Sequence, residues 1–172
     1  MEIKVKYFSN DYPRLEKLEK GDWIDLRVDS IDKVISVSDG ELDDIDIESI
    51  NNGFKLDLFG DLHYFKGDII KFNLGVAMEL PDGYEALIAP RSSTFKRWGL
   101  LQTNTPGVID NVYNGDNDEW GIEFIATRDG IINRHDRVCQ FRIQKNQPKF
   151  NIVEVKHLDN QDRGGYGTTG RD

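Results

Sequence analysis

The sequence predicts an all-β domain of the sandwich, jelly-roll or barrel type. Apolar and polar residues alternate through many short runs, and this period of two is typical of half-buried strands. Turn-forming residue pairs separate the runs, among them Asp82-Gly83, Asn114-Gly115 and Asp129-Gly130. Helix-forming runs are scarce, and residues 12–20 and 92–98 are each expected to hold only a helical turn or two. Many short strands separated by turns favour an all-β fold.

The expected strands follow one another along most of the chain. The N-terminal strand is the clearest, because Ile3, Val5 and Tyr7 alternate with charged residues. The later runs are rich in Val, Ile and Phe, which favour strands. In chain order, the expected strands are residues 3–7, 54–58, 69–72, 76–80, 84–89, 120–126, 138–143 and 150–155.

Two segments differ from the rest in composition. Residues 29–65 are acidic but keep strand-like alternation, so we expect an inserted hairpin with a solvated acidic face. Their acidic cluster lacks the residue order of an EF-hand calcium loop. Residues 159–172 are rich in glycine and poor in apolar side chains, which predicts a flexible arm. The expected organisation is therefore one domain over residues 1–158, with 29–65 inserted in it, followed by the arm.

Composition excludes several classes of protein. The net charge of −9 opposes non-specific binding to nucleic acid, which depends on Lys and Arg neutralising phosphates. No apolar run approaches the ~20 residues of a membrane span, and the charged start MEIKVKYFSN does not resemble a signal peptide. The single cysteine, Cys139, excludes a disulfide framework and is expected to be a small buried hydrophobe. We therefore expect a cytoplasmic protein without membrane or nucleic-acid partners.

Residues 107–115, GVIDNVYNG, are the most informative segment. The β-branched pair before Asp110 places this carboxylate at the end of a strand. Asn114-Gly115 is a hairpin signal, so Tyr113 is expected on the returning arm. A carboxylate and a flat ring beside a hairpin suit a small planar ligand and an activated water. Asp and Asn are also ordinary turn residues, so this segment alone does not identify a site.

Two further segments could bind phosphate. Residues 164–170 read GGYGTTG, and glycine-rich loops with hydroxyls expose backbone N–H groups to phosphate oxygens. They do not match a P-loop, because no Lys followed by Ser or Thr comes after the glycines. Residues 90–93, Pro-Arg-Ser-Ser, offer a fixed turn, a guanidinium and two hydroxyls. Each segment is a weak signal by itself.

Five segments together carry a stronger signal. In chain order they are WIDLR (23–27), APRSS (89–93), NTPGVIDNVYNG (104–115), HDRVCQFRI (135–143) and GGYGTTG (164–170). Their order and content resemble the five motifs of the trimeric dUTP diphosphatases, over nearly the whole chain apart from the acidic segment. The resemblance implies a β-jelly-roll homotrimer with three active sites at subunit interfaces, where the glycine-rich arm closes over a neighbour's site.

The resemblance also implies a reaction and roles for residues. The reaction is Mg²⁺-dependent hydrolysis of dUTP to dUMP and pyrophosphate, which keeps uracil out of DNA and supplies dUMP for dTMP synthesis. Asp110 matches the general base that activates water, and Tyr113 matches the ring that packs on the deoxyribose and refuses ribonucleotides. Asp25 matches the carboxylate that holds Mg²⁺ through water. The other residues that match substrate-binding positions are Arg91, Ser92, Ser93, Asn104, Gly107, Val108, Ile109, Gln140, Arg163, Gly165, Tyr166, Gly167 and Thr168.

The sequence departs from the family pattern in three places. The usual Ala-Gly-Tyr before the first-motif Asp is Asp22-Trp23-Ile24 here. The usual γ-phosphate Arg before the Gly-Gly pair is Gln161, so either Arg163 takes over this clamp or the clamp is weakened. The usual Phe over the uracil is Tyr166, and Trp120 is a rival for this cap, although a Trp is more often a core residue.

Two alternative functions stay open at this stage. dCTP deaminase shares the fold and the trimer, and Glu123 falls near the position of its catalytic Glu. Residues 116–118, which disturb the register of Glu123, together with Tyr113 and the glycine-rich arm, favour the diphosphatase. Phage members of the family also act as partners of repressor proteins, and residues 29–65 are the candidate surface for such a role.

Overall fold

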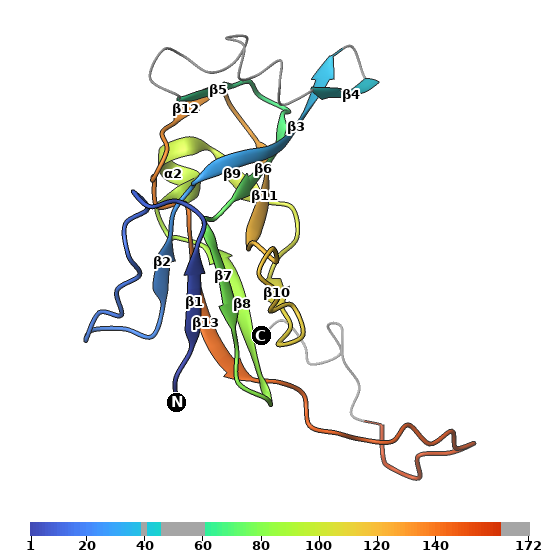
Figure 1. Ribbon diagram of the computed structural model, residues 1–172. Coiled ribbons are helices and arrows are strands. Elements are labelled where there is room, and N and C mark those ends of the chain that lie inside the picture. Colours follow the sequence, from blue (N-terminus) through green and yellow to red (C-terminus); the bar gives the residue numbers. More distant parts are fainter. Residues whose placement is uncertain (39–40, 46–60, 163–172) are drawn as a thin grey trace.

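The computed structural model describes residues 1–38, 41–45 and 61–162 of the chain. Strands dominate these residues and form two larger antiparallel sheets and two small ones (Figure 1). The all-β prediction is therefore confirmed. No helix in the described part is long and apolar enough to cross a membrane.

The first larger sheet has four strands in the order β10-β8-β13-β2. Their bounds are Ile24–Leu26 for β2, Tyr84–Pro90 for β8, Gly107–Ile109 for β10 and Cys139–Lys145 for β13. The β13–β8 pair is the longest, because all seven residues of β13 face partners on β8. Strands β2 and β10 are short and form the two edges of this sheet.

The second larger sheet has five strands in the order β4-β3-β6-β11-β9. Their bounds are Ser30–Ser38 for β3, Glu41–Ile45 for β4, Ile69–Asn73 for β6, Leu100–Gln102 for β9 and Gly121–Ala126 for β11. Strands β3 and β4 form the expected hairpin within the acidic segment. However, residues 30–35 of β3 also pair with β6, so the first part of the acidic segment belongs to the five-stranded sheet.

Two small sheets and one short helix complete the described fold. Strand β1 (Lys4–Tyr7) pairs with β7 (Val76–Glu79), and β5 (Leu62–Tyr64) pairs with β12 (Gly130–Ile132). The helix α2 spans Thr94–Trp98, within the run expected to hold a helical turn. It ends because Gly99 adopts a left-handed conformation with φ of 67°.

The apolar side chains of the strands meet in one core. The inward positions of β6 and β11 contribute Phe72 and Phe124, whose ring centroids lie 6.3 Å apart. Cys139 is fully buried as expected, and burial raises the pKa of its thiol. Trp120 is 0% exposed and packs edge-on against Phe141 at 5.2 Å. Trp120 is therefore a core residue in this chain.

Three sequence-based expectations differ from the structure or fall outside it. Residues 12–20 contain no helix, and the buried Tyr12 bonds through its hydroxyl to both backbone groups of Arg27. Residues 150–155 form no strand, although Phe150 and Ile152 alternate with polar residues, because no described strand of this chain pairs with them. The expected strand 54–58 lies outside the described residues.

The hairpin expected around Asn114-Gly115 is also absent. Strand β10 pairs with β8, whereas the next strand, β11, lies in the other sheet. The turn is closed by a side chain, since the Gly115 N–H donates to the Asp118 carboxylate at 2.7 Å. Tyr113 therefore lies in a connection between the two sheets and not on a returning arm.

Candidate active site

The four-stranded sheet brings four predicted site residues together near its β2 edge. In the β13–β2 pair, Gln140 lies opposite Asp25, and in the β13–β8 pair it lies opposite Ala89. Strand β8 ends at Pro90, so Arg91 and Ser92 follow directly beside this row. The register thus gathers residues from three distant parts of the sequence.

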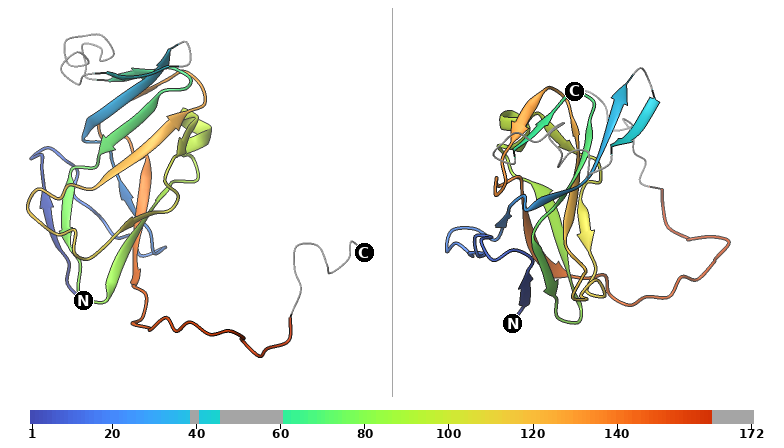
Figure 2. Two further views of the ribbon diagram at one scale, coloured as in Figure 1. Left: turned by 90° about the vertical axis from the view of Figure 1, so that its right-hand side faces the viewer. Right: turned by 45° about the horizontal axis from the view of Figure 1, so that its top comes forward.

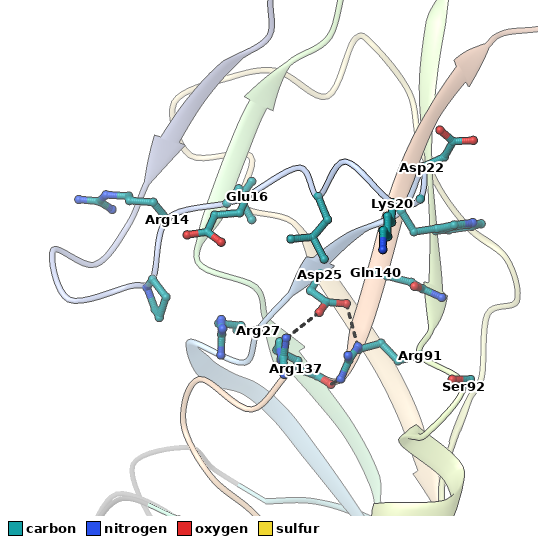
Figure 3. Close-up of a pocket in the computed structure, with 15 residues that line it drawn as sticks. Arg14, Glu16, Lys20, Asp22, Asp25, Arg27, Arg91, Ser92, Arg137 and Gln140 are labelled. Atoms are coloured by element: carbon teal, nitrogen blue, oxygen red, sulfur yellow. Dashed lines mark hydrogen bonds and ion pairs between the residues drawn. The ribbon is translucent and has the colours of Figure 1, made fainter.

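These residues line a pocket of about 480 Å³, which we call the Asp25 pocket (Figure 3). Five of its lining side chains are cationic and three are acidic, although the whole chain carries a net charge of −9. The local excess of positive charge suits an anion. The lining residues are Pro13, Arg14, Leu15, Glu16, Leu18, Lys20, Gly21, Asp22, Trp23, Asp25, Arg27, Arg91, Ser92, Arg137 and Gln140.

Asp25 is paired with two arginines in this pocket. Arg91 Nε lies 2.7 Å from Asp25 Oδ1, and Arg137 Nη1 lies 3.2 Å from Asp25 Oδ2. The carboxylate therefore holds two guanidinium groups at the pocket wall, where they could meet phosphate oxygens. Arg137 was not among the site residues predicted from the sequence. The sequence feature that could have identified Arg137 is its position in the segment HDRVCQFRI, three residues before Gln140.

The Asp25 pocket suits a magnesium ion that is bound together with the phosphate oxygens of a ligand. Among the described residues, it has too few carboxylates near Asp25 to bind the ion without such a ligand. The described residues contain no group of three or more His, Cys, Asp or Glu side chains that could hold a metal ion. Mg²⁺ keeps several waters and commonly binds through one or two carboxylates together with substrate phosphates. A single carboxylate, Asp25, is sufficient for that arrangement.

A second pocket, of about 320 Å³, contains four more of the predicted site residues. We call it the Tyr113 pocket, and it lies beyond the opposite edge of the four-stranded sheet, between β10 and the strands β6, β9 and β11. Its lining residues are Lys71, Asn73, Gln102, Asn104, Gly107, Ile109, Tyr113, Glu119, Gly121, Ile122 and Glu123.

The local contacts of the Tyr113 pocket orient its polar groups. The Tyr113 hydroxyl donates to the Glu119 carbonyl oxygen at 3.1 Å, which leaves the ring 41% exposed. Gln102 Nε2 donates to the Asn104 carbonyl oxygen at 2.6 Å. A Cβ at Gly107 would come within 3.1 Å of Gln102 Nε2, so glycine keeps this backbone accessible.

Two carboxylic acids also face the Tyr113 pocket. Desolvation raises the pKa of Glu119, although its carboxylate accepts the Gly75 N–H at 2.8 Å. Glu123 accepts a hydrogen bond from the Thr103 hydroxyl at 2.7 Å. Because Glu123 pairs with Lys71 in an uninterrupted β11–β6 ladder, residues 116–118 leave it facing the pocket.

The remaining predicted site residues either line neither pocket or lie outside the described residues. Asp110 is exposed immediately after β10, and it lines neither pocket. Val108 and Ser93 also line neither pocket. Residues 163 and 165–168 lie outside the described residues. The two pockets share no lining residue, so the described part of one chain does not bring the predicted site together.

Comparisons with known proteins agree on one family. The dUTPase family model matches residues 48–170. The chain is 45% identical over 170 residues to the SPbeta prophage-derived deoxyuridine 5'-triphosphate nucleotidohydrolase of Bacillus subtilis (strain 168), covering 99% of each chain. It is 40% identical over 98 residues to the corresponding nucleotidohydrolase of Hydrogenobaculum sp., covering 56% of this chain and 67% of that protein.

Solved structures support the same fold. The dUTPase from phage phi11 of S. aureus, whose structure describes the coordination of a structural Mg(II) ion, matches with a TM-score of 0.62 at 15% identity. That match covers 93% of this chain and 100% of the phage chain. The Staphylococcus bacteriophage 80alpha dUTPase with dUpNHpp matches with a TM-score of 0.63 at 15% identity, covering 98% of each chain.

Proposed function

The chain belongs to the dUTPase family, and we propose that it hydrolyses dUTP to dUMP and pyrophosphate with the triphosphate in the Asp25 pocket. The register that gathers Asp25, Arg91, Ser92 and Gln140 into one basic pocket carries this proposal. The B. subtilis relative named deoxyuridine 5'-triphosphate nucleotidohydrolase supports the choice of substrate. The all-β fold shared with the phage dUTPases supports the same assignment.

In the proposed mechanism, Asp110 accepts a proton from a water molecule whose oxygen attacks the α-phosphorus. The bond from the α-phosphorus to the bridging oxygen breaks, and pyrophosphate leaves with that electron pair. Positioned bases of this kind contribute about 10²–10⁴-fold in rate. Arg91 and Arg137 stabilise negative charge on the phosphates, as preorganised donors do.

Magnesium and the nucleoside have separate places in this proposal. Asp25 would hold Mg²⁺ through water, and the ion would neutralise charge on the phosphate oxygens. The Tyr113 pocket would receive the nucleoside, with the exposed Tyr113 ring against the deoxyribose. The accessible backbone at Gly107 would read the edge of the uracil, together with Asn104 and Ile109.

The site is proposed to form between protomers of a homotrimer. Asp110 follows β10 at one edge of the four-stranded sheet, whereas Asp25 lies on β2 at the other edge.

Residues 146–162 run away from the rest of the described chain (Figure 2). Apolar side chains on this segment are largely exposed, namely Phe150, Ile152, Val153, Val155 and Leu158. A neighbouring protomer would cover them, because exposed apolar patches mark interaction sites.

Coexpression of two inactive variants tests the shared site. Asp110→Asn and Arg91→Ala change residues at opposite edges of the four-stranded sheet, because Asp110 follows β10 and Arg91 lines the Asp25 pocket beside β2. If each active site combines Asp110 of one protomer with Arg91 of another, mixed oligomers regain part of the dUTPase activity that each variant lacks alone. If mixed oligomers form but remain inactive, the site is contained within one chain.

Substrate assays test the reaction itself and the deaminase alternative. Purified protein with Mg²⁺ should release pyrophosphate from dUTP and no ammonia from dCTP. The assay with dCTP is warranted by Glu123, which faces the Tyr113 pocket. Ammonia release from dCTP would assign this carboxylate to deamination. A protein partner for residues 29–65 stays a prediction, since residues 39–40 and 46–60 lie outside the described part.

A further inference from the structure

The connection between β1 and β2 forms one wall of the Asp25 pocket. Residues 13–16, 18 and 20–23 all line it, and Figure 3 shows this connection passing beside Asp25. Two hydrogen bonds order the middle of this connection: the Leu15 N–H donates to the Tyr7 hydroxyl at 3.1 Å, and Lys17 Nζ donates to the Gly21 carbonyl oxygen at 2.9 Å. The backbone of the connection therefore brings its side chains to the pocket.

Two of the five cationic side chains in the Asp25 pocket, Arg14 and Arg27, contact groups other than the Asp25 carboxylate. The Arg14 guanidinium lies over the Tyr7 ring, 4.2 Å from its centroid. Arg27 Nη1 donates to the His135 carbonyl oxygen at 2.8 Å. Both groups are fixed by contacts within the chain.

The other three cations differ in their partners. Arg91 and Arg137 are both paired with Asp25. Lys20 has no hydrogen bond or ion pair with any described residue, and its ammonium points into the pocket (Figure 3). An unpaired ammonium beside four guanidinium groups adds to their mutual repulsion, which a bound polyanion would relieve.

We propose that Lys20 binds the terminal phosphates of the substrate and thereby selects for a nucleoside triphosphate over a monophosphate. This inference rests on the proposed function. The bound triphosphate places its negative charge among the guanidinium groups, and Lys20 supplies a further cation from the connection between β1 and β2. Because the ammonium has three donors on a flexible stem, it can follow phosphate oxygens without a fixed geometry.

Binding of two nucleotides separates this role from a general effect on folding. Isothermal titration calorimetry on the full-length protein with Mg²⁺ would compare a non-hydrolysable imido analogue of dUTP with dUMP. Lys20→Met should weaken binding of the analogue by roughly tenfold, as expected for the loss of a hydrogen bond to a charged group, and leave dUMP binding unchanged. Lys20→Arg should retain most of the affinity for the analogue.

A matched control removes the same charge elsewhere. Lys4 is paired with Glu79 on the β1–β7 sheet and lines neither pocket, so Lys4→Met should bind both nucleotides as the wild type does. Equal losses for Lys20→Met and Lys4→Met would reduce the effect to net charge and overturn the proposal. An unchanged affinity of Lys20→Met for the analogue, or an equal loss for dUMP, would also overturn it. A wild-type protein that neither binds the analogue nor hydrolyses dUTP would instead refute the proposed function.

Discussion

Arg91 Nε lies 2.7 Å from Asp25 Oδ1, and this ion pair links the end of β8 to the edge strand β2. Both side chains keep about a quarter of their surface exposed, at 24% and 27%, so the pair faces the Asp25 pocket. The same carboxylate is the only predicted contact for magnesium. Asp25 therefore has two roles in the proposed site: it orients guanidinium groups, and it is available to a hydrated ion.

Replacing Asp25 with Asn should raise the magnesium concentration needed for half-maximal activity and lower kcat/KM. The substitution removes the charge that attracts the ion and loosens Arg91. Stability should change by no more than about 1 kcal/mol, because partly exposed ion pairs contribute little. Steady-state kinetics over a magnesium titration would measure the effect. Asp22→Asn is the control, since Asp22 lines the same pocket, and an identical magnesium dependence in the two variants would contradict the role of Asp25.

Replacing Asp110 with Asn should abolish most turnover and preserve nucleotide binding. The amide keeps the size of the side chain but cannot take the proton from water, so we expect a loss of about 10²–10⁴-fold in kcat. Single-turnover rates together with the dissociation constant of the non-hydrolysable analogue would separate the two effects. Asp116→Asn removes the same charge in the turn that follows and should leave the rate near that of the wild type. A variant Asp110→Asn with nearly full activity would exclude this residue as the base.

Replacing Tyr113 with Ala should weaken discrimination between dUTP and UTP. The ring is exposed in the pocket, and its hydroxyl is held by the Glu119 carbonyl oxygen. Tyr113→Phe keeps the ring and loses only that hydrogen bond, so it should retain most of the discrimination. The ratio of kcat/KM for the two nucleotides is the measurement. Equal reductions of both rates in Tyr113→Ala would show that the ring does not select the sugar.

Local patterns predicted the strands β1, β6, β7, β8, β11 and β13, because each carries its own run of apolar residues, whereas the three-residue strands β2, β9 and β12 were not among the expected strands. Residues 139–145 alternate between inward and outward positions, and this can be seen without a structure. The contact between Gln140 and Asp25 could not be predicted from such patterns, because it depends on the register between strands that are 115 residues apart in the sequence. Only the resemblance to a known family predicted that Gln140 and Asp25 belong to one site.

Two sequence-based expectations were wrong for physical reasons. Asn114-Gly115 predicts a two-stranded hairpin, but the Asp118 side chain closes this turn and the chain crosses to the other sheet. Residues 150–155 have the alternation of a strand, but a strand also needs a partner, and the described part of this chain offers none. The second case shows that alternation specifies a surface of a strand and not the neighbour with which the strand pairs.

Replacing Glu119 with Gln should stabilise the protein at neutral pH. Desolvation raises the folded-state pKa of Glu119 above its unfolded value, so the fold favours the protonated acid. This contribution to stability is present at acidic pH and is lost as the pH rises through the folded-state pKa. Gln stays neutral and can still accept the Gly75 N–H. Urea unfolding at several pH values should show an advantage of the variant at neutral pH that disappears on acidification, whereas an advantage independent of pH would contradict this account.

Replacing Trp120 should affect the core and not the recognition of the base. The side chain is 0% exposed, packs on Phe141 and lines neither pocket. Trp120→Ala should therefore cost about 3–5 kcal/mol of the free energy of unfolding, measured by urea denaturation. Trp120→Phe should be milder and stay folded, which allows the affinity for dUMP to be measured. If Trp120→Phe kept its stability but lost dUMP affinity, the indole would have to leave the core and cover the base in the bound state.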